Sequence, residues 1–376
     1  MGGIYIHIPY CRKACTYCNF HFSTSMSTRP EFLKSLINEI ESRPPYFKEV
    51  ESIYFGGGTP SVLTAEELND LLASLAKIYS WDKTAEITFE VNPDDISKEY
   101  VTMIRDVGIN RLSIGVQSFF DEDLLFMNRS HNASQSKTAI SLAKDAGIEQ
   151  ISIDLIYGIP GASHEKWEEN IDTFLHLNVD HLSAYCLTVE EKTALHKQVE
   201  KGKVTLDDQH SYEQFSILIN KLILNGYEQY EVSNFCRNGK TAKHNSSYWQ
   251  SKPYMGFGPS AHSFNGTSRS WNVANNVKYN KAVNDGDPYF EEEILSLADR
   301  YNEYIMTGLR TKWGVSRNEI SMVFGEDYLD FFEKELLNNR FRDFIQDKDG
   351  VITVLTAGKF YSDAIASSFF KIQSDD

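Results

Sequence analysis

Short apolar runs recur through the first half of the chain, and each is followed by a segment with helical periodicity. The runs are rich in β-branched and aromatic residues, as strands usually are. They cover residues 4–9, 51–58, 86–92, 111–117, 150–158 and 180–187. Because strands that alternate with helices form βαβ units, this pattern predicts a parallel sheet.

Four helices are predicted between these strands from their apolar spacing and end signals. The first begins after Thr64, where Glu67 completes a capping box. The others cover about 97–107, 134–146 and 163–177, and glycine follows the first two of these. The apolar residues of the first helix fall on one face, which predicts that it packs on the sheet through Leu68, Leu71, Leu72 and Leu75.

The number of strand–helix units limits the choice of fold. Six units are visible, fewer than a complete (β/α)8 barrel needs. We therefore expect an α/β fold that forms an incomplete (β/α)6 TIM-like barrel. An open, doubly wound sheet is the alternative.

The pattern changes after about residue 190. We expect a partial barrel over 1–190, a barrel extension and linker over 191–293, and a mainly helical, winged-helix-like domain over 294–376. In the extension, a helix, one strand and a loop-rich aromatic segment are predicted over 207–225, 227–235 and 241–272. In the last domain we expect a hairpin near 348–355 and a final helix over 355–370.

Composition excludes several classes of protein. A run of about 18 apolar residues is missing, so no transmembrane helix is predicted. The first residues lack the basic region of a signal peptide, and we expect a cytoplasmic protein. The formal net charge of −16 argues against a nucleic-acid partner. In a reducing compartment the five cysteines indicate metal ligands rather than disulfides.

Three of the cysteines stand close together, as Cys11, Cys15 and Cys18 in the spacing C-x3-C-x2-C. Structural zinc sites take four protein ligands, and ordinary iron–sulfur clusters take four cysteines. The next cysteine is Cys186, so the fourth position is either filled from elsewhere or open. If three thiolates hold a [4Fe-4S] cluster, one iron is free to take an external ligand.

Polar residues and a glycine turn also stand at the ends of predicted strands. The turn GGGTP at 56–60 ends the second strand, Glu90 and Gln117 end the third and fourth, and Asp154 lies late in the fifth. Function gathers at this end of a barrel, whereas packing alone predicts Val, Ile or Leu. A tight turn would explain the three glycines equally well, but a buried carboxylate is costly without a partner.

The cysteine spacing and the GGGTP turn together resemble the radical S-adenosylmethionine (SAM) superfamily. The segments EVNP (90–93), RLSIGVQSF (111–119) and DLIYGIP (154–160) are similar to its coproporphyrinogen III dehydrogenase branch, and the resemblance covers nearly the whole chain. It implies a [4Fe-4S] cluster on the three cysteines. It also implies SAM at the open iron, where an electron from the cluster would give a 5′-deoxyadenosyl radical.

The resemblance also implies the residues that contact SAM. Tyr17 would lean on the adenine, Glu90 and Arg129 would pair with the methionine and sulfonium region, and Gln117 and Asp154 would hold the ribose hydroxyls. Packing remains open for Tyr17, and a solvated surface position for Arg129. The full implied set is Tyr5, Tyr17, Gly57, Gly58, Thr59, Glu90, Gln117, Arg129 and Asp154.

Two departures from the dehydrogenase change the expected function. Phe20 stands where the dehydrogenase has a further cysteine, and its N-terminal extension has no counterpart in this sequence. The segment KHNSSYW (243–249) instead resembles the heme chaperone group of the branch. That group binds heme as cargo and passes it to respiratory heme proteins, which implies contact with membrane-bound partners. His244 is then a candidate heme ligand, with packing in an aromatic loop as the alternative.

We therefore expect a heme chaperone of the radical SAM type. The alternatives are an oxygen-independent coproporphyrinogen III dehydrogenase and a radical SAM enzyme with another substrate, so whether the protein is an enzyme stays open and no catalytic residue is assigned. His21 and His262 are weaker heme candidates, and Cys186 and Cys236 are expected to be buried structural thiols. The oligomeric state and the heme recipient are not indicated.

Overall fold

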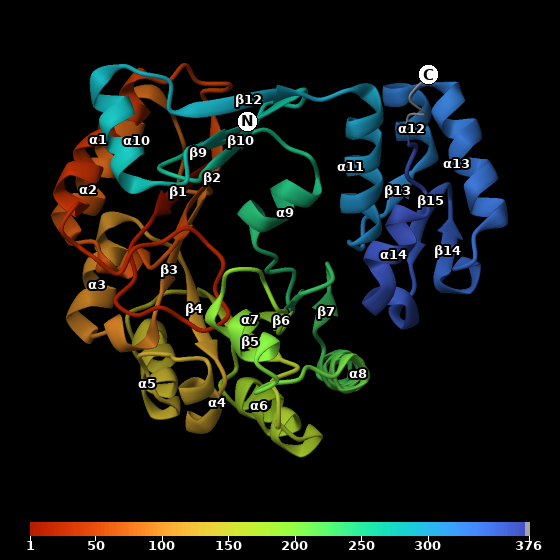
Figure 1. Cartoon of the computed structure of the whole chain (residues 1–376), viewed down its shortest axis with the longest axis horizontal. Helices are drawn as coiled ribbons and strands as arrows, with labels where there is room; N and C mark the ends of the chain where they lie inside the picture. Colours follow the sequence, from red (N-terminus) through yellow and green to blue (C-terminus); the bar gives the residue numbers. More distant parts are fainter. Residues whose placement is uncertain (373–376) are drawn as a thin grey trace.

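A computed structural model describes residues 1–372, and one large sheet runs through it (Figure 1). The sheet has twelve strands in the order β12-β11-β10-β9-β1-β2-β3-β4-β5-β6-β8-β7. Its first six strands in the chain pair with one another in parallel and in sequence order. They are β1 (Gly2–Ile8), β2 (Val50–Gly57), β3 (Glu86–Val91), β4 (Arg111–Gln117), β5 (Gln150–Tyr157) and β6 (His181–Cys186).

These strands confirm the α/β prediction, since each expected range agrees with the structure within two residues. The strand order of the described residues has two ends, β12 and β7, so the sheet does not close into a complete barrel. Buried Ile, Val, Leu and Phe side chains on both faces form the main core, as expected for a parallel sheet that is covered on both faces.

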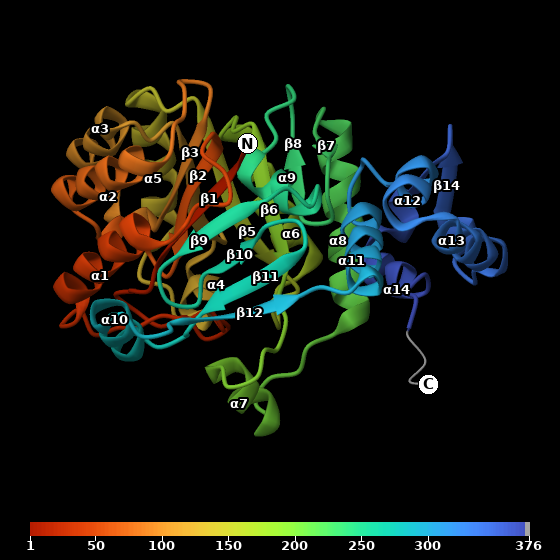
Figure 2. The ribbon, with the colours of Figure 1, turned by 90° about the horizontal axis from the view of Figure 1, so that it is seen from above.

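Helices cover the outer face of the parallel strands, and α1, α2, α3 and α5 lie along it in Figure 2. The four predicted helices are present, and Thr64 and Glu67 form the expected capping box at the start of α2. Helix α1 was not predicted from the sequence. The helices of this half are α1 (Arg29–Ser42), α2 (Ala65–Ile78), α3 (Lys98–Val107), α4 (Asp121–Phe126), α5 (Ala133–Asp145) and α6 (His164–His176).

The segment after β6 departs from the sequence expectations. The single strand predicted over 227–235 is wrong, because the chain turns back between two short strands. Asn234 causes the turn, since its backbone and side-chain N–H groups both donate to Glu231. The elements are α7 (Ala194–Glu200), α8 (Asp208–Leu224), β7 (Glu228–Gln229) and β8 (Asn234–Cys236).

The aromatic segment predicted to be a loop is largely ordered. Its strand β9 pairs in parallel with β1, and β10, β11 and β12 extend the sheet in antiparallel fashion. The prediction of a loop-rich segment is therefore wrong over 254–272. Its elements are α9 (Lys243–Trp249), β9 (Tyr254–Phe257), β10 (His262–Phe264), β11 (Ser268–Asn272), α10 (Asn276–Asp285) and β12 (Phe290–Ile294).

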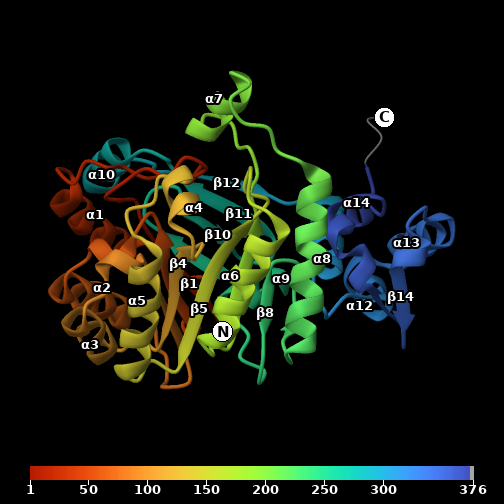
Figure 3. The same ribbon diagram turned by 90° about the horizontal axis from the view of Figure 1, so that it is seen from below.

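The C-terminal part has an apolar core of its own, which runs from Tyr301 to Phe369. Helix α8 lies between this part and the sheet in Figure 3, where Tyr212 and Phe215 pack against Phe360. The predicted hairpin is formed by β14 and β15. The elements are α11 (Leu297–Leu309), β13 (Val315–Ser316), α12 (Arg317–Phe324), α13 (Glu326–Asn338), β14 (Ile345–Lys348), β15 (Val351–Val354) and α14 (Ser362–Ser367).

The final helix predicted over 355–370 is shorter than expected. Its first part, Thr356–Tyr361, is a 3-10 helix, and only α14 is α-helical. Across residues 1–372, none of the helices has the length and apolar character needed to span a bilayer. The limits proposed for the three domains stay predictions.

Candidate functional site

A cavity of about 430 Å³ opens among the loops at the carboxyl ends of the parallel strands. All three clustered cysteines line it, and so do all the predicted SAM contacts except Tyr5. The structure therefore brings together residues from the loops after β1 and β2, from β3, β4 and β5, and from the segment after α4. This is the end of the sheet at which parallel folds place their ligands.

The cysteine loop is held at two of its thiols by hydrogen bonds. Thr59 Oγ1 donates to Cys11 Sγ at 3.3 Å, and Arg129 Nη1 donates to Cys15 Sγ at 3.3 Å. Burial raises the pKa of the Cys11 thiol to about 11 and also raises the pKa of Cys18. A bound metal is then needed to hold these groups as thiolates, which are the forms that ligate metals.

The thiols are spaced for a cluster rather than for one ion. Among residues 1–372, the one group of three or more potential ligand atoms that all lie within 4.8 Å of one another contains no cysteine. At least one pair of the three sulfur atoms therefore lies more than 4.8 Å apart, which is further than the ligands of a single metal ion. Such an arrangement suits a polynuclear iron–sulfur centre.

The glycine turn after β2 packs tightly against the start of the cysteine loop. Gly57 has φ +106°, and a Cβ atom there would lie 2.6 Å from the His7 ring. A Cβ atom on Gly58 would lie 2.8 Å from backbone atoms of Ile8 and Tyr10. Close packing thus already explains two of the glycines, and the turn brings Thr59 onto Cys11.

Arg129 lines the cavity and is half-buried. Besides its bond to Cys15, its Nη2 atom donates to Asn92 Oδ1 at 2.7 Å and to the Gly115 carbonyl oxygen at 2.9 Å. Its Nε atom is buried without a hydrogen-bond partner among the described residues. These hydrogen bonds hold Arg129 in the wall of the cavity, so the solvated surface position considered for it is wrong.

Two half-buried carboxyl groups, Glu90 and Asp154, line the same cavity. Burial raises the pKa of Glu90 to about 7, although Tyr54 donates a 2.6 Å hydrogen bond to its Oε1 atom. Burial also raises the pKa of Asp154 to about 6, against hydrogen bonds from Ser183 and Ser113. Two carboxyl groups that ionise reluctantly will favour a cationic ligand between them, because a positive charge offsets the cost of burial.

Gln117 and Tyr17 complete the wall of the cavity. Gln117 ends β4 with φ +67° and is only 9% exposed. A non-glycine residue in this backbone region is strained, and such strain is concentrated at functional sites. The Tyr17 ring also packs beside a small apolar cluster that includes Leu124 and Ile156, and burial raises the pKa of its hydroxyl group.

Tyr5 and His244 lie outside the cavity, in a separate aromatic stack. The His244 ring lies 5.1 Å from Tyr54 and 6.5 Å from Tyr5, measured between centroids. Its Nδ1 atom bonds to Ser52 Oγ and its Nε2 atom to Tyr248 Oη, both at 2.8 Å. His244 is 1% exposed, and burial lowers its pKa to about 3. These contacts are those of a packed side chain.

Comparisons with known proteins also indicate a radical SAM protein. The model of the radical SAM superfamily matches residues 5–174. The heme chaperone HemW of Bacillus subtilis (strain 168) is 32% identical, over 98% of this chain and 99% of its own length. HemW of Lactococcus lactis subsp. lactis (strain IL1403) is 33% identical, over 92% and 94%.

The chain belongs to the HemW family of radical SAM proteins. Among solved structures, coproporphyrinogen III oxidase (HemN) from Escherichia coli, described as a radical SAM enzyme, has a TM-score of 0.86 at 23% identity. That likeness covers 98% of this chain and 90% of the other, and at this identity it shows the fold alone.

The radical SAM site contains residues that sequence reasoning missed. Ser113 donates to both Asp154 oxygens at 3.3 Å, and Gly115 accepts from Arg129. Ser113, Gly115 and Gln117 alternate along β4, so they lie on one face of the strand. This alternation was visible in the sequence and could have identified Ser113 once Gln117 had been chosen.

The end of β6 also lines the radical SAM cavity, through Tyr185, Cys186 and Leu187. Cys186 was expected to be a buried structural thiol, but it is half-buried at the cavity wall. Cys236 is fully buried, as expected. Nothing in the spacing of these residues marked the sixth strand as part of the site.

The residues present fit the cofactors of a radical SAM protein. Three thiols stand on one loop, and the guanidinium side chain of Arg129 and two carboxyl groups line the same cavity. SAM offers matching groups, since it carries an ammonium, a carboxylate and a sulfonium. The family therefore implies a [4Fe-4S] cluster and SAM for this chain.

Proposed function

We propose that this protein is a heme chaperone that holds a [4Fe-4S] cluster and SAM in its cavity. The similarity to HemW proteins over nearly the whole chain carries the proposal. The fold does not discriminate, because the HemN structure has the same fold under a different activity.

The proposed roles of the cavity residues follow from their chemistry. Cys11, Cys15 and Cys18 would ligate three irons of the cluster, and Arg129 would donate to Cys15 and to the SAM carboxylate. Glu90 would accept from the SAM ammonium group and Asp154 from the ribose. When bound to the cluster, SAM is a source of a 5′-deoxyadenosyl radical. Whether this chain cleaves SAM is left to experiment.

The mouth of the cavity offers apolar rings to a flat ligand. Phe20 lines it and is 68% exposed, and Tyr185 lines it at 46% exposed. Two exposed aromatic rings among the lining residues of one cavity give it apolar contact surface. Heme presents a large apolar face, so we propose that the macrocycle stacks on these rings beside the cluster.

Phe20 gives a direct test of this docking mode. In the cluster-loaded protein, Phe20→Ala should weaken heme binding by roughly 5- to 30-fold, because about 1–2 kcal/mol of ring contact is lost. Titration of heme against the absorption of the bound form measures the change under anaerobic conditions. Met322→Ala is the matched control, since Met322 is 76% exposed but lies on α12 in the C-terminal part.

Equal affinities of the two variants would remove Phe20 from the heme site. Loss of heme binding in both variants would point to a global effect instead of a contact. If neither variant nor the wild-type protein binds heme, the proposed function is wrong.

The resemblance to the chaperone group also implies His244 as an iron ligand. Because His244 lies outside the cavity, this would be a different heme position from the one beside Phe20 and Tyr185. The Nε2 atom of His244 can reach an iron only if the hydrogen bond to Tyr248 breaks and α9 moves away from β2. We also propose that this protein acts in the cytoplasm and passes heme to respiratory heme proteins at the membrane surface. The support for these finer points is the resemblance to the chaperone group.

A further inference from the structure

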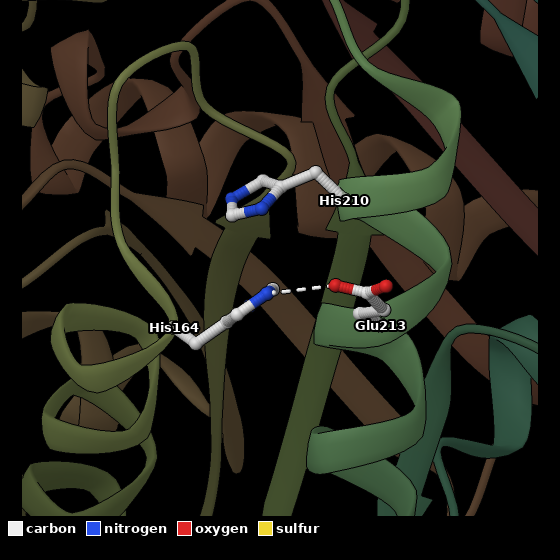
Figure 4. Close-up of side chains that lie close together, drawn as sticks. All are labelled: His164, His210 and Glu213. Atoms are coloured by element: carbon white, nitrogen blue, oxygen red, sulfur yellow. Dashed lines mark hydrogen bonds and ion pairs between the residues drawn. The ribbon is translucent and has the colours of Figure 1, made fainter.

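Two histidines and a carboxylate meet between α6 and α8, away from the cluster cavity. His164 is the first residue of α6, and His210 and Glu213 lie one turn apart on α8 (Figure 4). One ligand atom from each lies within 4.8 Å of the other two. In the part of the chain that the structure describes, this is the only such group of three.

The three side chains are already arranged around a common point. His164 Nε2 lies 2.9 Å from Glu213 Oε2, and the two imidazole rings stack with their centroids 4.4 Å apart. Metal–ligand bonds of about 2.0–2.1 Å imply distances of roughly 3.3 Å between the ligand atoms of a tetrahedral site. Small rotations of exposed side chains would therefore bring all three ligand atoms onto one ion.

The outer nitrogen of His210 is held by groups that would fix its orientation. Nε2 lies 2.8 Å from the carbonyl oxygen of Ala162 and 3.0 Å from Nε2 of Gln214. Gln214 accepts a hydrogen bond from the Gly158 N–H at its Oε1 atom, so its amide nitrogen faces His210 Nε2 as a donor. For Nε2 to donate to the Ala162 carbonyl oxygen, the amide nitrogen of Gln214 must turn away from it, because that nitrogen is also a donor. Nδ1 then keeps its lone pair for an ion, which is how metal-binding histidines are commonly oriented.

Glu213 would supply the negative charge of the site. Gln209 donates to its Oε1 atom at 2.8 Å, and this hydrogen bond and His164 lower the pKa of Glu213. The carboxylate is thus ionised at neutral pH. The dipoles of α6 and α8 disfavour a cation near their N-termini, and the negative charge of Glu213 opposes this effect. The effect of the dipoles is also small compared with the energy of metal–ligand bonds.

A metal-free arrangement, in which protons on the histidines hold the three side chains together, explains only part of this geometry. A protonated His164 would pair with Glu213, but protonating His210 as well would place two positive rings face to face. One divalent ion shared by two neutral imidazoles and a carboxylate avoids that repulsion. His164 Nδ1 is buried without a hydrogen-bond partner among residues 1–372, so this ring is oriented only by the contact of Nε2 with Glu213.

We propose that His164, His210 and Glu213 bind one divalent transition-metal ion of the zinc type, with water in the fourth position. Two imidazoles and one carboxylate form a ligand set that zinc accepts. The proposal rests on these residues alone and is independent of the proposed heme role.

The position of the site suggests what the ion would do. His164 follows the loop after β5, the strand that carries Asp154, whereas His210 and Glu213 flank Tyr212, which packs on Phe360 and Tyr361 of the C-terminal part. An ion would therefore join the loop beside the SAM cavity to the helix that supports the C-terminal part. Its role would be to brace this junction.

Zinc binding by the cluster-loaded protein tests the site, because the cluster keeps the three cysteines from taking up zinc. We expect one Zn²⁺ per chain by metal analysis after desalting, with a dissociation constant in the micromolar range or below, measured against a chromophoric chelator. His210→Ala and Glu213→Gln should each weaken binding by more than about 100-fold, beyond the usual cost of a second-shell change. The control His196→Ala, in the exposed pair with Glu200 on α7, should bind zinc like the wild type.

The temperature of unfolding provides a second readout. Zinc should raise the midpoint of the wild-type protein and of His196→Ala, but not that of the two site variants, because an ion that binds only the folded state stabilises it. Glu213→Gln preserves the size of the side chain, so it tests the site even if His210→Ala fails to fold. The proposal is overturned if the wild-type protein takes up no zinc, or if the site variants bind it as tightly as the control.

Discussion

Glu90 and Asp154 should make SAM binding depend on pH. Their pKa values are raised to about 7 and about 6, and in the proposed binding mode the SAM amino group donates to Glu90 and the ribose hydroxyls donate to Asp154. Binding then favours the ionised carboxylates, so affinity should rise with pH. Below pH 7 it should fall by about tenfold per unit, as the ionised fraction of Glu90 falls, and above pH 8 it should be constant. Calorimetric titration of the cluster-loaded protein from pH 6 to 8.5 measures the profile.

The Glu90→Gln variant is the control for this profile. It keeps the size of the side chain but cannot ionise, so its SAM affinity should be lower at pH 8 and should change less between pH 6 and 8. A wild-type affinity that is flat over the whole range would show that neither carboxyl group pairs with SAM.

His244 should contribute strongly to stability whatever its part in heme binding. Its removal leaves a cavity in the aromatic stack and deprives Ser52 and Tyr248 of their hydrogen bonds. We expect His244→Ala to lower the free energy of unfolding by roughly 3–5 kcal/mol. Urea unfolding measures this, with the exposed His176 as the control, where His176→Ala should change stability by less than about 0.5 kcal/mol.

Heme titration of the same variant separates the two roles of His244. Loss of an iron ligand would shift the heme absorption band, whereas loss of a packed side chain would leave the band of the folded variant unchanged. A stability equal to that of the wild type would contradict the packing described above.

At the scale of single residues, the sequence predicted which residues line the cavity better than it predicted which residues pack around them. Cysteine spacing and lone polar residues in apolar strands are strong local signals, and those residues line one cavity. The burial of His244 has no local signal, because it depends on Tyr5, Tyr54 and Ser52, which lie far away in the sequence.

At the scale of the element, the turn after β2 should be the least tolerant of added atoms. In Gly57→Ala the new methyl group would meet the His7 ring, in addition to the strain of a positive φ. Gly108, after α3, has φ +115° with open space around it, so Gly108→Ala should lower the free energy of unfolding only by the backbone strain of about 1–2 kcal/mol. We expect Gly57→Ala to lose more stability and to hold less cluster after reconstitution.

Unfolding curves and iron content of the two variants measure the difference. Equal losses in both would show that the turn can shift away from His7 without cost. A stable Gly57→Ala protein that holds a full cluster would remove the turn from the site's framework.

Elements with strong internal periodicity were predictable, and those fixed by distant partners were not. The capping box at Thr64 and the glycine after α3 end their helices as the sequence indicates. By contrast, β9 is a strand because its backbone pairs with β1, some 250 residues earlier in the chain. The turn at Asn234 likewise depends on a buried contact to Glu231 that no propensity scale reports.

For the whole molecule, the open sheet leaves the cavity accessible from outside. The parallel strands bring the polar residues to one end of the sheet, and no residue of the edge strands β12 and β7 lines the cavity there. Six strand–helix units could be counted in the sequence, which is why the incomplete barrel could be predicted. The antiparallel extension could not, because its strands are short and rely on the edge of the sheet for their pairing.

The central claim is that this protein carries heme and does not convert a porphyrinogen. The decisive measurement compares two anaerobic samples of cluster-loaded protein, one given heme and the other given coproporphyrinogen III with SAM and a reductant. We predict stable heme binding in the first and unchanged coproporphyrinogen III in the second. Protoporphyrinogen in the second sample, or no heme bound in the first, would contradict the account.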